Sequence, residues 1–196
     1  MLALVLWSAC GPSDGVDGLR KHRDPDLSFM YPATWELTHD TFELDTPDSR
    51  VLILRAPGDA VVMIHRFIPA TGWTLREFAR EFATQRSVRL SQQGAARPRE
   101  VKTSQLSLAP RGRPLQGLRQ DFELERNGVS SQQTSLFFAV PRGGVQVFVS
   151  AHAPRPMANA LASDLKTVLS SIRGGSLMED ETSELGPKLE VSEGAR

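Results

Sequence analysis

The chain has 196 residues, of which 40% are hydrophobic and 23% charged, and its formal net charge is zero. These values suit one globular domain with extensions at its ends, and they argue against a general binder of nucleic acid. The single cysteine excludes a disulfide within the chain and any metal site built from several thiolates. No apolar run approaches the roughly 20 residues that a membrane-spanning helix needs.

Residues 1–9 form an apolar segment of the length found in signal peptides, and Cys10 follows it directly. Ser8 and Ala9 are small, as cleavage before the cysteine requires. This pattern resembles the lipobox of bacterial lipoproteins, whose cysteine is acylated after the preceding peptide is removed. The resemblance implies a lipid anchor at Cys10 and a place in the cell envelope, on the periplasmic or extracytoplasmic side of a bacterial membrane. Ordinary secretion, or a buried N-terminal strand with an incidental cysteine, are the open alternatives.

The segment after the cysteine is polar. Residues 11–26 (GPSDGVDGLRKHRDPD) show no apolar periodicity, which indicates that residues 10–26 form a flexible tether carrying the lipidated cysteine. A tether of this length reaches about 20–24 Å on average, enough to hold a folded domain just clear of a membrane. The folded domain is therefore expected to span residues 27–173.

Strand signals open the expected domain. The stretch that begins at Leu27 (LSFMYPATWELTHDTFELDTP) contains short strands and is broken at Pro32. Two runs rich in β-formers follow at residues 51–56 and 60–68, and a Pro-Gly-Asp turn joins them. The extended apolar blocks in both runs indicate strands that are buried on both faces.

The apolar spacing then changes to that of a helix, in TLREFAREFATQRS. Five apolar residues recur at i, i+3, i+4, i+7 and i+8, which places them on one helix face: Leu75, Phe78, Ala79, Phe82 and Ala83. Thr74 and Glu77 form a T-x-x-E capping box, which marks the start of a helix. A helix is therefore predicted over residues 74–86.

Further strands and a second helix are expected in the C-terminal half. LRQDFELE alternates as a strand with one solvated face, Asn127-Gly128 is a strong hairpin signal, and SSQQTSLFFAV returns from the hairpin. Another turn leads into VQVFVSAHA, and a helix is expected over residues 156–173, where apolar residues recur on one face. Residues 174–196 are rich in acidic residues and are expected to form a disordered acidic tail.

Several of these stretches form a familiar combination. Residues 27–35 (LSFMYPATW) join an apolar strand to a Tyr-Pro turn and a tryptophan, and the helix TLREFAREF, the strands LFFAV and VQVFV and a terminal amphipathic helix follow. In this order the chain resembles the PsbP-like α/β/α sandwich over residues 27–173, and also the DcrB-type bacterial lipoproteins of that fold. The resemblance implies an α+β fold in which helices flank an antiparallel β-sheet. It also implies a binding or assembly module without a shared catalytic motif.

Few residues suggest catalysis or metal binding. None of the four histidines has a metal-ligand spacing to another histidine, cysteine or carboxylate cluster. No G-x-S-x-G motif or phosphate-binding glycine loop is present. His65 and His152 are expected to be ordinary strand residues, although a Ser/His/Asp group assembled by the fold stays open. No catalytic residue, metal or cofactor is therefore predicted, and the chain is not expected to be an enzyme.

Three carboxylates share one face of an expected strand: Asp121, Glu123 and Glu125. Such a row could bind calcium or supply an acid and a base. Arg119 and Arg126 flank it, so a solvated, charge-balanced face is the preferred interpretation. Trp35 and Trp73 are expected to anchor the core or a loop, with ligand stacking as the alternative.

Basic residues gather between residues 86 and 119, where Glu100 is the one acidic residue. An arginine-rich surface suits an anionic partner such as lipid headgroups, a wall polymer or an acidic protein face. The candidate residues for this contact are Arg97, Arg99, Lys102, Arg111 and Arg113. The alternative is that they reflect composition and solubility alone.

Two hypotheses of function follow. The first is a non-catalytic, membrane-tethered lipoprotein that acts as a binding or assembly module in the cell envelope. The second is a small-ligand carrier, or an envelope enzyme, with a pocket between sheet and helix near His65, His152 or Trp73. The first predicts a filled core with a flat or basic surface, and the second predicts a concave site with convergent polar groups.

Overall fold

The computed structural model describes most of the expected domain. The described residues are 18–24, 27–42, 49–67, 72–92, 98–126, 128–142 and 145–174. The expected signal segment, the expected lipidation site Cys10, the basic candidate Arg97 and the expected acidic tail from residue 175 onward lie outside these described residues.

Seven strands form the main sheet, in the order β3-β4-β5-β9-β8-β7-β6, and every neighbouring pair is antiparallel. Their bounds are Glu36–Phe42 (β3), Ser49–Ala56 (β4), Ala60–Phe67 (β5), Arg99–Leu108 (β6), Leu115–Arg126 (β7), Val129–Arg142 (β8) and Val145–Pro154 (β9). The predicted turn between β4 and β5 is confirmed, with a φ of 72° at Gly58 and 58° at Asp59. Glycine adopts this left-handed region freely and aspartate tolerates it.

A smaller sheet contains part of the segment expected to be a tether. Strand β1 (Leu19–Asp24) pairs antiparallel with β2 (Leu27–Pro32), and the short strand β10 (Arg173–Gly174) pairs with the other edge of β2. The predicted domain boundary at Leu27 is therefore wrong, because residues 19–24 belong to the folded domain. An edge strand is held by backbone hydrogen bonds. The mostly polar sequence of β1 consequently carries no apolar strand signal.

Helix α1 spans Leu75–Gln92 and is longer than the helix predicted over residues 74–86. The capping box at its start is confirmed. The Thr74 N–H donates to Glu77 Oε2 at 2.8 Å, and the Glu77 N–H donates to Thr74 Oγ1 at 3.2 Å. These two reciprocal bonds satisfy backbone donors that the first turn of a helix leaves without partners.

Helix α2 spans Ala158–Ser171 and is shorter than the predicted 156–173. A 3₁₀ turn (Arg155–Met157) precedes the helix, and the chain continues into β10 after it. Neither of the two described helices has the length and hydropathy that crossing a bilayer requires.

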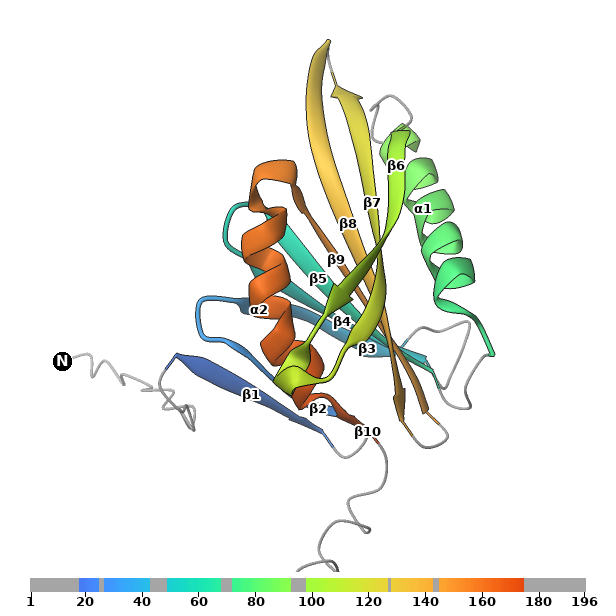
Figure 1. Ribbon diagram of the computed structural model, residues 1–196. Coiled ribbons are helices and arrows are strands. Elements are labelled where there is room, and N and C mark those ends of the chain that lie inside the picture. The colour runs from blue at the N-terminus through green and yellow to red at the C-terminus, as the bar shows by residue number, and fades with distance from the viewer. Residues whose placement is uncertain are drawn as a thin grey trace, which may run out of the picture.

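The two helices cover opposite faces of the main sheet (Figure 1). Alternation along a strand sends neighbouring side chains to opposite faces, and Phe137 and Phe138 of β8 illustrate this. Phe138 belongs to the larger core beneath α2, whereas Phe137 packs with Phe78 of α1. The Phe78 ring also stacks on Phe148, with ring centroids 4.3 Å apart. The predicted α+β class, an antiparallel sheet flanked by helices, is therefore confirmed.

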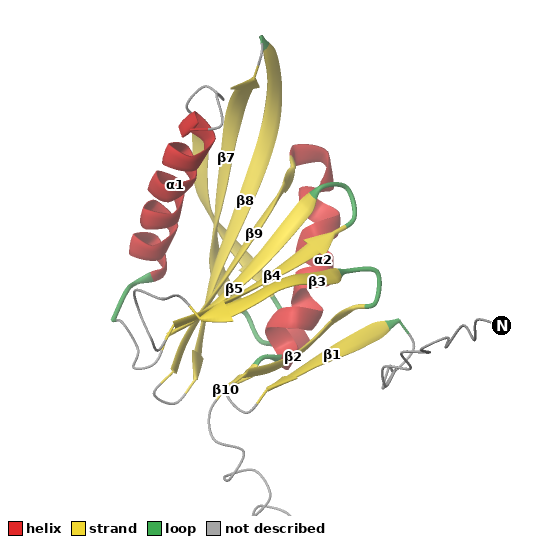
Figure 2. Ribbon diagram, turned by 180° about the vertical axis from the view of Figure 1, so that it is seen from behind, coloured by secondary structure: helices red, strands yellow, loops and turns green. Residues whose placement is uncertain are grey.

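Helix α1 leaves part of its sheet face uncovered. It packs against β7 and β8, and Figure 2 shows β3, β4 and β5 with no helix over the face turned to the viewer. On this face Ile53, Val61 and Met63 are only half-buried. The expectation that β4 and β5 are buried on both faces is thus wrong for this side, because α1 lies over the far half of the sheet.

Candidate ligand-binding site

A groove runs between α1 and the uncovered face of β4 and β5, and we call it the α1 groove. Its volume is about 520 Å³, within the range of roughly 300–1,000 Å³ typical of small-molecule sites. The sheet supplies an apolar floor: Val51, Ile53, Val61 and Met63. The helix supplies the wall: Phe82, Gln85, Arg86, Arg89 and Leu90.

Arg86 and His152 of the groove lining meet a third polar side chain, Ser135, which lines a smaller neighbouring cavity. Ser135 of β8 and His152 of β9 are opposite each other in the strand register, and Ser135 Oγ lies 2.7 Å from His152 Nδ1. Arg86 of α1 reaches both residues, because its Nη1 lies 3.1 Å from Ser135 Oγ and 3.2 Å from His152 Nδ1. Residues from three separate elements thus form one hydrogen-bonded cluster.

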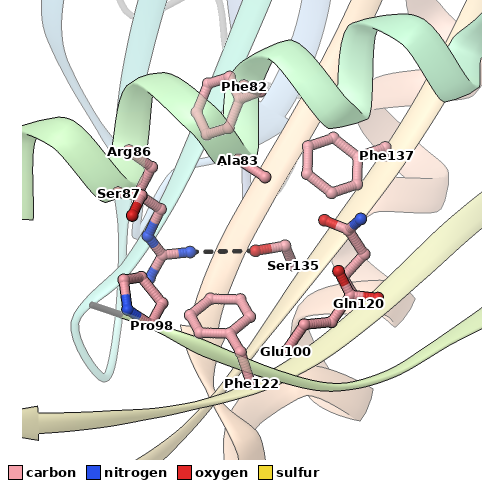
Figure 3. Close-up of a pocket in the computed structure, with 10 residues that line it drawn as sticks. All are labelled: Phe82, Ala83, Arg86, Ser87, Pro98, Glu100, Gln120, Phe122, Ser135 and Phe137. Carbon is pink, nitrogen blue, oxygen red and sulfur yellow. Dashed lines mark hydrogen bonds between the residues drawn. The ribbon is translucent and has the colours of Figure 1, made fainter.

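The guanidinium of Arg86 is held in an apolar setting. It lies 4.2 Å from the ring centroid of Phe122, a cation–π contact. Figure 3 shows the side chain extending from α1 toward Ser135, beside a smaller cavity of about 110 Å³ that we call the Arg86 cavity. Phe82 and Arg86 line both the Arg86 cavity and the α1 groove. Burial lowers the pKa of Arg86 to about 10, so the group stays protonated at neutral pH.

Three histidines line the groove, and two of them, the half-buried His65 and the buried His152, pack against aromatic rings. His65 lies edge-on to Phe78 at 5.2 Å, and the His152 ring stacks on Phe82 at 4.9 Å. Burial lowers the pKa of His65 to about 4. Burial first, and then the nearby Arg86 charge, lower the pKa of His152 well below its ordinary value. Both rings are therefore neutral at pH 7. The Nε2 atoms of both are buried and have no hydrogen-bond partner among the described residues.

The Ser135–His152 pair favours binding over catalysis. A nucleophilic serine needs a histidine basic enough to take its proton, and usually a carboxylate that orients the histidine. His152 is a poor base because its pKa is lowered. No carboxylate contacts the ring within the described part of the chain. What the cluster does offer is a fixed cation beside an apolar surface.

The structure does not gather the predicted basic residues into one compact patch. Arg99 and Lys102 lie near the start of β6, whereas Arg111 and Arg113 follow its end. Strands rise about 3.3 Å per residue, so the two pairs are separated by much of the strand's length. Arg99 also forms an ion pair with Glu123. Arg97 lies outside the described residues.

The other sequence candidates occupy structural positions. Asp121 accepts hydrogen bonds from Arg119 Nε at 3.1 Å and from Thr134 Oγ1 at 2.7 Å, as expected for a charge-balanced face. The described residues hold no group of three or more side chains suited to a metal ion. Trp35 is buried in the core, as expected, and Trp73 is partly exposed with its ring 6.0 Å from Phe67.

Sequence reasoning missed the two residues that complete the cluster around His152. Ser135 lies within an expected strand and matches no serine motif. Arg86 belongs to the basic stretch, but nothing in the sequence distinguishes it from Arg89, one helical turn later. Only the docking of α1 on the sheet separates them, because it leaves Arg86 half-buried and Arg89 exposed.

Comparison with known proteins finds similarity in structure alone. No family model and no curated protein sequence matches the chain. The solution structure of cyanobacterial PsbP (CyanoP) from Synechocystis sp. PCC 6803 is similar, with 14% identity, a TM-score of 0.49, and coverage of 86% of this chain and 99% of that one.

Two further structures are similar at lower scores. One is a protein of Bacteroides thetaiotaomicron VPI-5482, at 14% identity and a TM-score of 0.46, covering 80% of this chain and 48% of that one. The other is LpqN of Mycobacterium tuberculosis, described as involved in cell envelope biogenesis. It has 13% identity and a TM-score of 0.39, with coverage of 79% of this chain and 90% of that one. Similarity at this level carries no functional assignment.

Proposed function

We propose that this chain is a non-catalytic, lipid-anchored protein of the bacterial cell envelope whose folded domain binds an apolar or amphipathic small molecule in the α1 groove. The observation that carries the proposal is the half-buried floor of Ile53, Val61 and Met63 beside convergent polar groups. A module that binds only through its outer surface does not require a groove with an apolar floor.

Energetics supports a ligand in this position. Burying apolar surface stabilises by about 25 cal/mol for each Å² removed from water. The floor lies on β4 and β5, whose opposite face is packed in the main core. A ligand lying along β4 and β5 would complete the layer that α1 leaves open. The groove is also open at the surface, so a ligand could enter without unfolding of the domain.

The anchor at Cys10 belongs to the same proposal and rests on the lipobox-like sequence. One acyl chain holds a protein on a membrane only marginally, whereas two or three hold it stably. The basic residues near the two ends of β6 would then orient the tethered domain on an anionic surface, each contributing about 1 kcal/mol near the membrane. Cys10→Ser should move the protein from the detergent phase to the aqueous phase. An unmodified Met1 terminus in the protein from its own bacterium would refute the anchor.

Groove binding can be tested with N-phenyl-1-naphthylamine, a neutral apolar probe that fluoresces when it leaves water. The wild-type chain should bind the probe, and Val61→Glu should weaken binding at least tenfold because it places a charge on the floor. Val129→Glu is the matched control, since Val129 is an exposed valine in the β7–β8 hairpin, away from the groove. Equal binding by both variants, or none by the wild type, would overturn the proposed function.

A further inference from the structure

Arg86 differs from Arg50 and Arg119 in that no carboxylate among the described residues pairs with it. Arg50 pairs with Asp24 at 2.8 Å and with Asp40 at 2.6 Å, and Arg119 pairs with Asp121. Within the described part of the chain, the hydrogen-bond partners of Arg86 are a hydroxyl and an imidazole, both neutral. Arg86 is half-buried. Partial burial of a cation without an anionic partner is costly, and it marks a place where a bound anion would be stabilised.

The guanidinium is also oriented in advance. Nη1 makes both hydrogen bonds, and Phe122 supports the plane of the group. Nε and Nη2 donate to no described residue. Two parallel N–H groups of this kind match the two oxygens of a carboxylate. The fork lies where the α1 groove and the Arg86 cavity share their lining.

The charges around the groove select a single negative charge. Its lining contains two arginines, Arg86 and Arg89, against one carboxylate, Asp59. His65 and His152 are neutral at pH 7 because burial lowers the pKa of each. Glu100 lines the Arg86 cavity and adds a negative charge on that side. A dianionic head group would meet repulsion from Asp59 and Glu100, whereas a monoanion balances Arg86.

We infer that the ligand of the α1 groove is an amphipathic monocarboxylate, whose head group accepts hydrogen bonds from Arg86 and whose apolar chain covers Val61 and Met63. This inference rests on the proposed function and specifies its ligand class. The positive charge of Arg86 selects a negatively charged head group, and the apolar floor of the groove selects an apolar chain.

The test compares two probes of equal chain length, laurate and dodecan-1-ol, each used below its aggregation limit to displace N-phenyl-1-naphthylamine from the full chain at pH 7.5. The wild type should bind laurate at least tenfold more tightly than the alcohol. Arg86→Met should remove this preference while it still binds the alcohol, which shows that the groove is folded. Arg86→Lys should keep part of the preference, because lysine retains the positive charge but lacks the two parallel N–H donors of the guanidinium. Arg80→Gln is the matched control on the exposed side of α1 and should keep it all.

The possible outcomes distinguish failure of groove binding from failure of the monocarboxylate assignment. If neither probe binds the wild type, the proposed function fails, and the ligand class fails with it. If both probes bind equally, or if Arg86→Met keeps the preference for laurate, the monocarboxylate assignment is overturned. Ligand binding in the groove would still be supported. Tighter binding of dodecyl phosphate than of laurate would also overturn it, because the head group would then be a phosphate.

Discussion

The Nη1 atom of Arg86 lies 3.2 Å from Nδ1 of His152, and this contact determines the tautomer of the imidazole. A guanidinium can only donate hydrogen bonds, so Nδ1 must be an acceptor and the ring proton lies on Nε2. The hydroxyl of Ser135 then accepts from Arg86 and donates to His152 at 2.7 Å. In this arrangement Arg86 donates to both partners, Ser135 donates to His152, and His152 Nδ1 only accepts.

This hydrogen-bond order predicts an NMR signature. Long-range proton–nitrogen spectra of the ¹⁵N-histidine-labelled chain should show His152 as the Nε2–H tautomer. The ring should stay neutral at pH 6, because burial and Arg86 lower its pKa well below the ordinary value. A Nδ1–H tautomer, or protonation of the ring near pH 6.5, would show that the cluster is arranged differently.

Two phenylalanines of α1 should differ in their contribution to stability. Phe78 is 3% exposed and stacks on Phe148, so Phe78→Ala should lower the free energy of unfolding by about 3–5 kcal/mol. Phe82 is half-buried because one side faces the α1 groove, and Phe82→Ala should cost less, on the order of 1–2 kcal/mol. Urea denaturation measures both values. The reverse order would mean that α1 docks through a different face.

The ion pair between Asp24 and Arg50 tests whether β1 belongs to the fold. Arg50 is buried and joins Asp24 of β1 to Asp40 of β3. Asp24→Asn should therefore lower the free energy of unfolding by about 1–2 kcal/mol, since it removes one of the two anionic partners of a buried cation. Asp164→Asn, at an exposed position on α2, is the matched control. Equal free energies of unfolding for the two variants would mean that residues 19–24 belong to the tether and not to the fold.

Stability should fall as the pH decreases from 6.5 toward 4. In the folded chain burial lowers the pKa of His65 from 6.5 to about 4, so within this window the unfolded chain binds a proton that the folded chain does not. His65 alone should therefore cost about 2 kcal/mol between pH 7.5 and pH 5. Urea denaturation at the two pH values should show a smaller difference for His65→Leu than for the wild type. An unchanged difference would mean that the His65 ring titrates normally in the fold.

Features encoded locally are predictable from the sequence. The start of α1 follows from the reciprocal bonds of Thr74 and Glu77, and the turn at residues 57–59 follows from conformations that glycine and aspartate adopt readily. Strand β1 is not predictable in this way, because its partner supplies the backbone bonds and its side chains remain polar. Its Asp24–Arg50 pair joins residues that are distant in sequence.

The groove depends on tertiary packing, which no local pattern reports. The apolar residues of β4 and β5 have the pattern of strands buried on both faces, yet the position of α1 over β7 and β8 leaves one face open. The same docking separates Arg86 from Arg89 and brings it to Ser135 and His152. The expected pocket near His65, His152 or Trp73 includes this region, since the first two line the groove and Trp73 does not, but the expectation did not include Arg86.

The most direct test of the account is to observe where laurate lies on the protein. Nuclear Overhauser contacts between the chain of bound laurate and ¹³C-labelled methyl groups report proximity atom by atom. Laurate bound in the α1 groove should contact the methyl groups of Ile53, Val61 and Met63, and these contacts should be lost in Val61→Glu. Contacts confined to the exposed Val101 and Val129, or none at saturating laurate, would contradict a ligand in the α1 groove.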